Sequence, residues 1–302
     1  MKPSLMALAE TNNRPLRFRR NKARPNADIR CVIGCERLCK HRDAPLCAGV
    51  MIILLSPAKS LDFDSLAPSV EPSPLRFVDE AERLVRSAAR LSKARLKQIM
   101  PVSDALIDLN YARYRGFYDQ PERPAAFAFN GDVYSGLAAR TLDEPALDYA
   151  QNHVRILSGL YGLLRPLDNI RPYRLEMGTR WAPRHASLVS YWGDRIAAGI
   201  ADDLMQAGGD TVVNLASQEY FAAADKGLKR RKLRVVTADF RQQGPDGPRF
   251  VSFDAKRARG MAARFLCEHR HADPEALKGF DSDGYRFDPE TSDETTWRFI
   301  RA

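Results

Sequence analysis

Short apolar runs alternate with longer segments of helical periodicity through most of the chain after residue 50. Runs that are apolar at nearly every position are typical of strands buried on both faces of a sheet. We predict strands for these runs, at 51–55, 126–129, 154–157, 211–217, 235–240 and 250–254.

Apolar residues spaced three and four apart predict amphipathic helices between the strands. The segment 77–100 predicts two helices that break near Ser92, and Pro101 separates them from a helix at 102–118. Further helices are predicted at 142–153, 195–207, 220–228 and 255–268. Gly208-Gly209 should end the helix 195–207, because glycine accepts the left-handed backbone of a helix C-terminus. Alternating strands and helices favour a single α/β domain with a mixed β-sheet flanked by helices.

The predicted helix 255–268 carries a glycine and several basic residues. Gly260 in its interior costs about 1 kcal/mol relative to alanine, so we expect another backbone or a ligand to approach closely there. Lys256, Gly260 and Arg264 follow one another at intervals of four and lie on one face, with Arg257 beside them.

Charge is distributed unevenly along the 302 residues. The net charge is +9, but residues 1–50 hold 11 Lys and Arg and only 4 Asp and Glu. Residues 51–302 therefore hold 36 of the 47 basic and 34 of the 38 acidic residues, a net charge of +2. Because this part is nearly neutral, binding to nucleic acid would depend on local clusters of cations.

Cysteine is concentrated in the same leading segment, which contains Cys31, Cys35, Cys39 and Cys47. Their spacing matches neither a zinc finger nor a common iron–sulfur motif, and the remainder of the chain has only Cys267. We interpret residues 1–50 as a disordered leader or as translation from upstream of a true start at Met51, and 51–302 as the domain. With no disulfide framework, signal peptide or membrane-spanning run, we expect a cytoplasmic protein that does not use a membrane.

Polar residues follow several predicted strands, at the edge where α/β sheets present ligand groups. Ser56 and Lys59 follow the strand 51–55, and Ser158 follows 154–157. Asn214 and Ser217 lie at the end of 211–217. Lys59 suits either contact with a phosphate or a place in a surface loop, because no glycine-rich loop of a Walker motif precedes it.

Three carboxylates are candidates for acid/base chemistry: Asp132, Glu176 and Glu219. Asp132 follows a glycine, and a role in a turn is the more frequent explanation for such an aspartate. The three would also suit ferrous iron, yet no neighbouring histidine completes a facial triad, and pairing with Arg174 is the more ordinary explanation. His269 and His271 should point apart if both are on the helix, so we predict no metal site.

Six motifs occur in order between residues 51 and 287. They are SPAK at 56–59, FNGDVY at 129–134, LSGLYG at 157–162 with RPLD at 165–168, PYRLEMG at 172–178, NLAS at 214–217 with EY at 219–220, and AK at 255–256 with ARG at 258–260. Each motif alone is weak, but the ordered set is specific. Together they resemble the YaaA family of bacterial peroxide-stress proteins.

The resemblance implies a YaaA-type α/β fold with a helix-hairpin-helix element, whose counterpart here we take to be 96–115. It implies a cytoplasmic protein, induced under hydroperoxide stress, that limits unincorporated iron and so protects DNA from oxidative damage. It also implies a positively charged cleft that holds double-stranded DNA. The connection 101–103 lacks the glycines whose amides bind phosphate in such hairpins. The family implies no enzymatic reaction.

Two functions of different classes remain open from the residues. The first is DNA binding without sequence preference, because no base-reading module is visible. Its candidate residues are Arg171, Arg174, Lys256, Arg257, Arg259 and Arg264, with the basic run 229–234 as a rim.

The alternative is an enzyme that acts on a nucleotide or another anionic small molecule in a polar pocket at the strand ends. Arg174 and Lys256 would hold phosphate, and the three carboxylates would supply acid/base chemistry. The pocket would be lined by Ser56, Lys59, Ser158, Asn214 and Ser217. The residues specify neither a substrate nor a cofactor.

Overall fold

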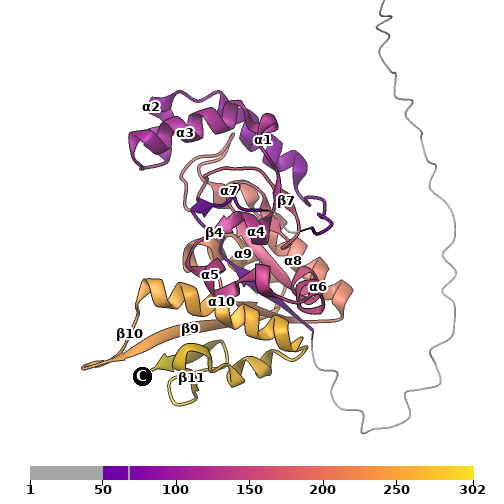
Figure 1. The fold of residues 1–302 in the computed structure, drawn as a ribbon, viewed down its shortest axis with the longest axis vertical. Helices are drawn as coiled ribbons and strands as arrows, with labels where there is room; N and C mark the ends of the chain where they lie inside the picture. The colour runs from indigo at the N-terminus through magenta and orange to yellow at the C-terminus, as the bar shows by residue number, and fades with distance from the viewer. Residues whose placement is uncertain (1–49, 67–68) are drawn as a thin grey trace, which may run out of the picture. The chain divides into compact units, whose positions relative to one another are not determined.

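The computed structural model describes residues 50–66 and 69–302 (Figure 1). The interpretation of residues 1–50 and the four cysteines there therefore lie outside the described residues, apart from residue 50. The strands are β1 (Met51–Leu55), β2 (Ser60–Leu61), β3 (Arg123–Pro124), β4 (Phe129–Asn130), β5 (Val154–Ser158), β6 (Gly162–Leu164), β7 (Asn169–Ile170), β8 (Thr211–Asn214), β9 (Arg234–Gly244), β10 (Gly247–Arg249), β11 (Tyr285–Asp288) and β12 (Thr296–Arg301).

Helices connect and cover these strands. They are α1 (Val78–Ala89), α2 (Lys93–Ile99), α3 (Asp104–Arg115), α4 (Ala125–Ala128), α5 (Asp132–Leu137), α6 (Glu144–His153), α7 (Leu188–Trp192), α8 (Arg195–Ala207), α9 (Gln218–Arg230) and α10 (Ser252–His269). Four short 3-10 turns, η1 to η4, lie at Phe117–Asp119, Ala139–Thr141, Pro274–Gly279 and Ser282–Gly284. None of the helices in the described ranges is long and apolar enough to span a membrane.

The main sheet is mixed, as the sequence predicts. Its strand order is β11-β12-β9-β8-β1-β5-β6, with β10 paired to β9. The five central strands run parallel, and β6 and β11 run antiparallel at the two edges. Every residue of β1 is buried, because β1 has a strand on each side and side chains packed on both faces, which explains its uninterrupted apolar sequence. The carboxyl ends of the parallel strands consequently meet at one edge.

Two groups of helices pack on this sheet. In the first, α8 and α9 pack together and α8 contacts β1. In the second, α10 packs against α5 and α6 and contacts β9 (Figure 1). The close approach that Gly260 predicts is confirmed: a Cβ there would lie 1.8 Å from the carbonyl oxygen of Val133 on α5. Gly136 on α5 is the reciprocal contact, since its Cβ would lie 2.2 Å from the carbonyl oxygen of Arg257.

Helix ends follow local sequence signals. The helix α8 ends at Ala207 as predicted, and Gly208 takes the left-handed conformation with φ of 73°. The side chain of Ser92 accepts a hydrogen bond from the backbone amide of Arg95, at 3.2 Å, and so separates α1 from α2 at the predicted break.

Two of the strand predictions are wrong. Residues 126–129 form the end of α4 and the start of β4, because a short buried apolar run suits a helical turn as well as a strand and alanine favours the helix. The predicted strand 250–254 is instead the start of α10, with Phe250 and Phe253 exposed. The apolar residues of this short run therefore do not belong to a buried strand.

The helices α2 and α3 form a hairpin joined by residues 100–103, in the region predicted for the helix-hairpin-helix element. The hairpin packs on a second, smaller core cluster that includes Leu96, Ile107 and Tyr114. The hydroxyl of Tyr114 donates a hydrogen bond of 2.8 Å to the backbone carbonyl of Arg174. The hairpin is thereby attached to the loop that carries the PYRLEMG motif.

Candidate functional site

Two adjoining cavities lie where the carboxyl ends of β1 and β8 approach the helical hairpin. The first, which we call the hairpin cleft, measures about 520 Å³ and lies between α2, residues 100–102 and the loop 174–180. The second, which we call the strand-end pocket, measures about 400 Å³ and lies between residues 56–60 and the first turns of α5, α9 and α10. Lys59 and Glu219 line both cavities, so the two share a wall.

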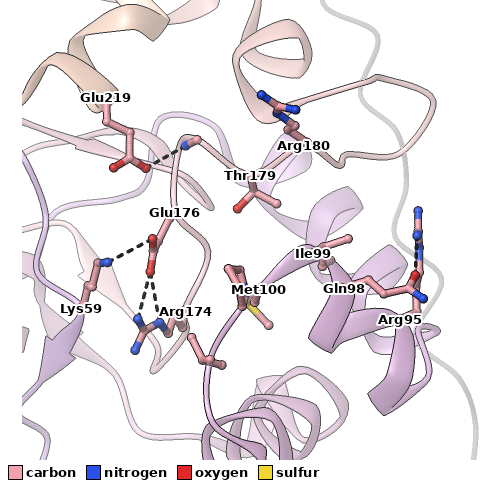
Figure 2. Close-up of a pocket in the computed structure, with 13 residues that line it drawn as sticks. Lys59, Arg95, Gln98, Ile99, Met100, Arg174, Glu176, Thr179, Arg180 and Glu219 are labelled. Carbon is pink, nitrogen blue, oxygen red and sulfur yellow. Dashed lines mark hydrogen bonds and ion pairs between the residues drawn. The ribbon is translucent and has the colours of Figure 1, made fainter.

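The two carboxylates that line the hairpin cleft, Glu176 and Glu219, form ion pairs or hydrogen bonds with neighbouring groups. Glu176 lies between Lys59 Nζ, at 3.2 Å, and Arg174 Nη2, at 3.0 Å (Figure 2). Glu219 Oε1 accepts a hydrogen bond of 2.9 Å from the backbone amide of Gly178. The pairing of Glu176 with Arg174 is confirmed.

Two arginines in the hairpin cleft have no carboxylate partner among the described residues. Arg95 on α2 donates from Nη1 to the side-chain oxygen of Gln98, at 2.7 Å, and Arg180 is exposed. Figure 2 shows both away from the group formed by Lys59, Arg174 and Glu176. Sequence reasoning missed both arginines. Arg180 lies only two residues after the PYRLEMG motif, which could have drawn attention to it. Nothing in the sequence around Arg95 marks it, because the folding of α2 against the loop 174–180 is what places it in the cleft.

The strand-end pocket is organised by a contact between two serines. Ser217, just before α9, donates its backbone amide to Ser56 Oγ at 2.8 Å, and Ser56 Oγ in turn donates to Ser217 Oγ at 3.2 Å. The hydroxyl of Tyr134 donates to the carbonyl oxygen of Ser56 at 3.1 Å. These bonds connect the end of β1 to α5 and α9. Asp132 at the start of α5 and Lys256 on α10 also line the pocket.

Arg259 has an unusual environment on the wall of the strand-end pocket. Its Nε is buried and has no hydrogen-bond partner among the described residues. Burial lowers the pKa of the guanidinium below its usual value, and the charge of Asp239 only partly opposes this. An arginine in a protein nevertheless stays charged. Arg259 is therefore a partly exposed cation with a buried, unused donor beside a cavity.

Two predicted pocket residues lie elsewhere. Ser158 is fully buried, and its Oγ is 2.7 Å from the Tyr173 hydroxyl and accepts from the backbone amide of Tyr161 at 3.0 Å. Asn214 is also buried; it donates to Thr237 Oγ1 at 3.2 Å and accepts from the backbone amide of Ala216 at 3.0 Å. Neither lines the two cavities.

Three predicted DNA-binding arginines also lie outside the two cavities. Arg171 pairs with Glu122 at 2.8 Å. Arg264 pairs with Glu268 at 2.6 Å and donates to the carbonyls at the end of α5. Arg257 is exposed and lies 3.7 Å from a carboxylate oxygen of Asp283. The basic run 229–234 is largely paired as well, through Lys229, Arg230, Arg231 and Arg234.

The histidines near the end of α10 do not point apart. Their rings are stacked, with centroids 5.3 Å apart and an interplanar angle of 6°. The expectation assumed that both residues are on the helix, but α10 ends at His269 and Arg270 takes a left-handed conformation, so His271 lies beyond the helix. Cys267 is buried, and burial raises the pKa of its thiol to about 12. Residues 50–66 and 69–302 contain no group of three or more His, Cys, Asp or Glu side chains arranged to hold a metal ion.

The fold and these cavities define an α/β protein with a polar cleft between the carboxyl edge of its sheet and the hairpin of α2 and α3. The model of the family described as peroxide stress protein YaaA matches residues 51–291. The chain belongs to this family.

Similar proteins are members of the family designated UPF0246. One, from Rhizorhabdus wittichii, is 56% identical over 252 residues, which cover 83% of this chain and 99% of that protein. Another, from Caulobacter vibrioides, is 46% identical over 257 residues, covering 83% of this chain and 99% of the relative. A third, from Ruegeria pomeroyi, is 46% identical over 257 residues, with 83% and 98% covered.

Proposed function

We propose that this peroxide-stress protein binds double-stranded DNA through the hairpin cleft and, during hydroperoxide stress, protects DNA from oxidative damage. The observation that carries the proposal is the pair Arg95 and Arg180, which line the cleft without a carboxylate partner among the described residues. Arginines that are not neutralised locally are available for phosphate oxygens, to which they can donate two parallel hydrogen bonds. The helical hairpin that borders the cleft supports the same assignment.

The other cations of the cleft have a supporting part in this proposal. Lys59 and Arg174 share the charge of Glu176, so they contribute less to phosphate binding than the two unpaired arginines. Contacts to phosphates alone position a protein without reading sequence, so the proposed binding is not sequence-specific.

Limitation of unincorporated iron is part of the same proposal. It is supported by family membership and not by a set of metal ligands in the described residues. Protection of DNA and restriction of iron act on the same damage, because iron that is not incorporated into proteins generates the radicals that attack DNA.

Fluorescence anisotropy with a labelled duplex, measured over a series of salt concentrations, tests the DNA-binding part. In the full chain, Arg95→Ala with Arg180→Ala should weaken binding and reduce the slope of log affinity against log salt by about 2, since each lost phosphate contact removes about 0.9. The matched control is Arg249→Ala with Arg286→Ala, which removes two exposed arginines outside the cleft.

The control also accounts for the basic leading segment, because both double variants retain its net charge of +7. Equal slopes for the two double variants would refute the assignment to the hairpin cleft. Loss confined to the cleft variant would support it.

A further inference from the structure

The side chain of Arg259, which lines the strand-end pocket, lacks a carboxylate of its own to pair with among the described residues. The carboxylate whose charge acts on Arg259 is that of Asp239. It already accepts hydrogen bonds from two other arginines, from Arg241 Nε at 2.9 Å and 3.0 Å and from Arg298 Nε at 3.0 Å. The buried Nε of Arg259 has no hydrogen bond among the described residues. A buried donor on a charged group is costly to leave unpaired, so such groups are satisfied by a partner or by a ligand.

Lys256 precedes Arg259 by one turn of α10 and lines the same pocket. It is exposed and forms no ion pair in the described part of the chain. Most arginines that the sequence singled out behave differently, because Arg171, Arg174 and Arg264 each have a carboxylate within 3.0 Å. The pocket thus contains two uncompensated cations next to each other on one helix.

We propose that the strand-end pocket binds a phosphate monoester, with Arg259 and Lys256 holding the phosphate. The inference goes beyond DNA binding by the hairpin cleft and does not depend on it, because it concerns a different cavity and different residues. Two cations suit the charge of a phosphate monoester at neutral pH, between about −1.5 and −2. The fork of an arginine matches two phosphate oxygens, and the hydroxyl of Ser217 is a neutral donor nearby.

The carboxylates of the pocket indicate what the phosphate is attached to. Glu219 is held by the amide of Gly178, but Asp132 forms no ion pair among the described residues. A carboxylate repels phosphate and accepts hydrogen bonds from hydroxyl groups. A phosphorylated sugar would offer its phosphate to the two cations and its hydroxyl groups to Asp132. The cavity volume of about 400 Å³ lies within the range of small-molecule sites. The ligand is therefore a sugar phosphate, either in a free nucleotide or at the 5′ end of a DNA strand.

Isothermal titration calorimetry on the full chain tests the proposal with four phosphate-bearing probes: inorganic phosphate, ribose 5-phosphate, AMP and a 5′-phosphorylated duplex. Ribose, adenosine and the same duplex with a 5′-hydroxyl are the matched probes without the terminal phosphate. Arg259→Lys keeps the charge but removes the fork, and it should weaken binding about tenfold to a hundredfold. Lys256→Ala replaces an exposed residue, so it tests the site without endangering the fold.

The control substitution is Arg257→Ala. Arg257 neighbours Lys256 on the same helix, has the same charge and lines a different cavity. It should leave affinity for ribose 5-phosphate unchanged. Phosphate-dependent binding that is lost in Lys256→Ala and Arg259→Lys but retained in Arg257→Ala supports the proposal.

The probes also identify the source of the phosphate. Preference for AMP over both duplexes identifies a free nucleotide, and preference for the phosphorylated duplex over its hydroxyl counterpart identifies a DNA end. Two results would overturn the proposal. One is that inorganic phosphate, ribose 5-phosphate and AMP do not bind at millimolar concentrations and the 5′-phosphate adds no affinity to the duplex, and the other is an equal loss in Arg257→Ala and Lys256→Ala. Because DNA binding by the cleft is tested with Arg95 and Arg180, failure of either proposal leaves the other to be judged separately.

Discussion

Replacing Gly260 with alanine tests the contact between α10 and α5. In an unobstructed helix the change would stabilise the protein by about 1 kcal/mol, because alanine is the better helix former. Here the new Cβ would lie 1.8 Å from Val133 O and 2.8 Å from Leu137 N, whereas ordinary contact begins near 3.4 Å. Both neighbours are backbone atoms, so the helices must move apart by more than an ångström.

The size of the effect follows from these two opposing contributions. Overpacking typically costs 1–3 kcal/mol, and contact with backbone on a second helix places this site at about 3 kcal/mol. Subtracting the gain in helix propensity leaves a net destabilisation of about 2 kcal/mol. For a domain of this size, each kcal/mol lowers the melting temperature by roughly 2–4 °C, so we expect a fall of about 4–8 °C.

Thermal unfolding followed by circular dichroism measures the change. Gly116→Ala is the matched control, because its nearest atom would be 3.7 Å away and its φ of −95° suits alanine. That control should change the free energy of unfolding by less than about 0.5 kcal/mol. A Gly260→Ala protein that melts at or above the temperature of the wild type would refute the packing argument.

Two further predictions concern ion pairs. In Asp203→Ala, Arg155 loses a carboxylate that lies 2.6 Å from its Nε in a buried environment, and urea unfolding should show a loss of about 3–5 kcal/mol. Arg155→Met combined with Asp203→Leu should recover only part of this loss, because Arg76 also pairs with Asp203 and stays unpaired in the double variant. No recovery would contradict the reasoning. Hydrogen bonds from Arg231 and Arg230 lower the pKa of Asp194 from 3.8 to about 2. The ionised carboxylate of Asp194 therefore stabilises the folded protein above pH 3.8, and this contribution is lost as the pH falls toward 2. Asp194→Asn should flatten this part of the pH profile of the melting temperature, and an unchanged profile would count against the assignment.

Sequence reasoning succeeded where the signal is local. The continuous apolar run of β1, the break at Ser92 and the glycine that ends α8 each depend on a few neighbouring residues. The polar residues after β1 lie beyond its carboxyl end, as the end of a short apolar run predicts, and they line the strand-end pocket. Gly260 was informative because a glycine inside a helix is unfavourable unless something approaches closely.

The rest of the site depends on contacts between residues far apart in the chain. Whether Ser158 faces a cavity or the core is decided by the side of the sheet to which its side chain points, and it is buried against Tyr173. Arg264 was a reasonable candidate on charge alone, but the end of α5 takes its donors. The isolation of Arg259 arises because Arg241 and Arg298 already hold Asp239, and no local pattern reveals that.

The wall shared by the two cavities makes their contents interdependent. Lys59 lines both and is held by Glu176, which also neutralises Arg174. An anion that draws Lys59 into the strand-end pocket would leave Glu176 with only one cation and make the hairpin cleft more negative. Thermodynamic reciprocity then requires that whatever fills the cleft alters affinity in the pocket by the same factor. A ligand in either cavity would then change the affinity of the other cavity through the position of Lys59.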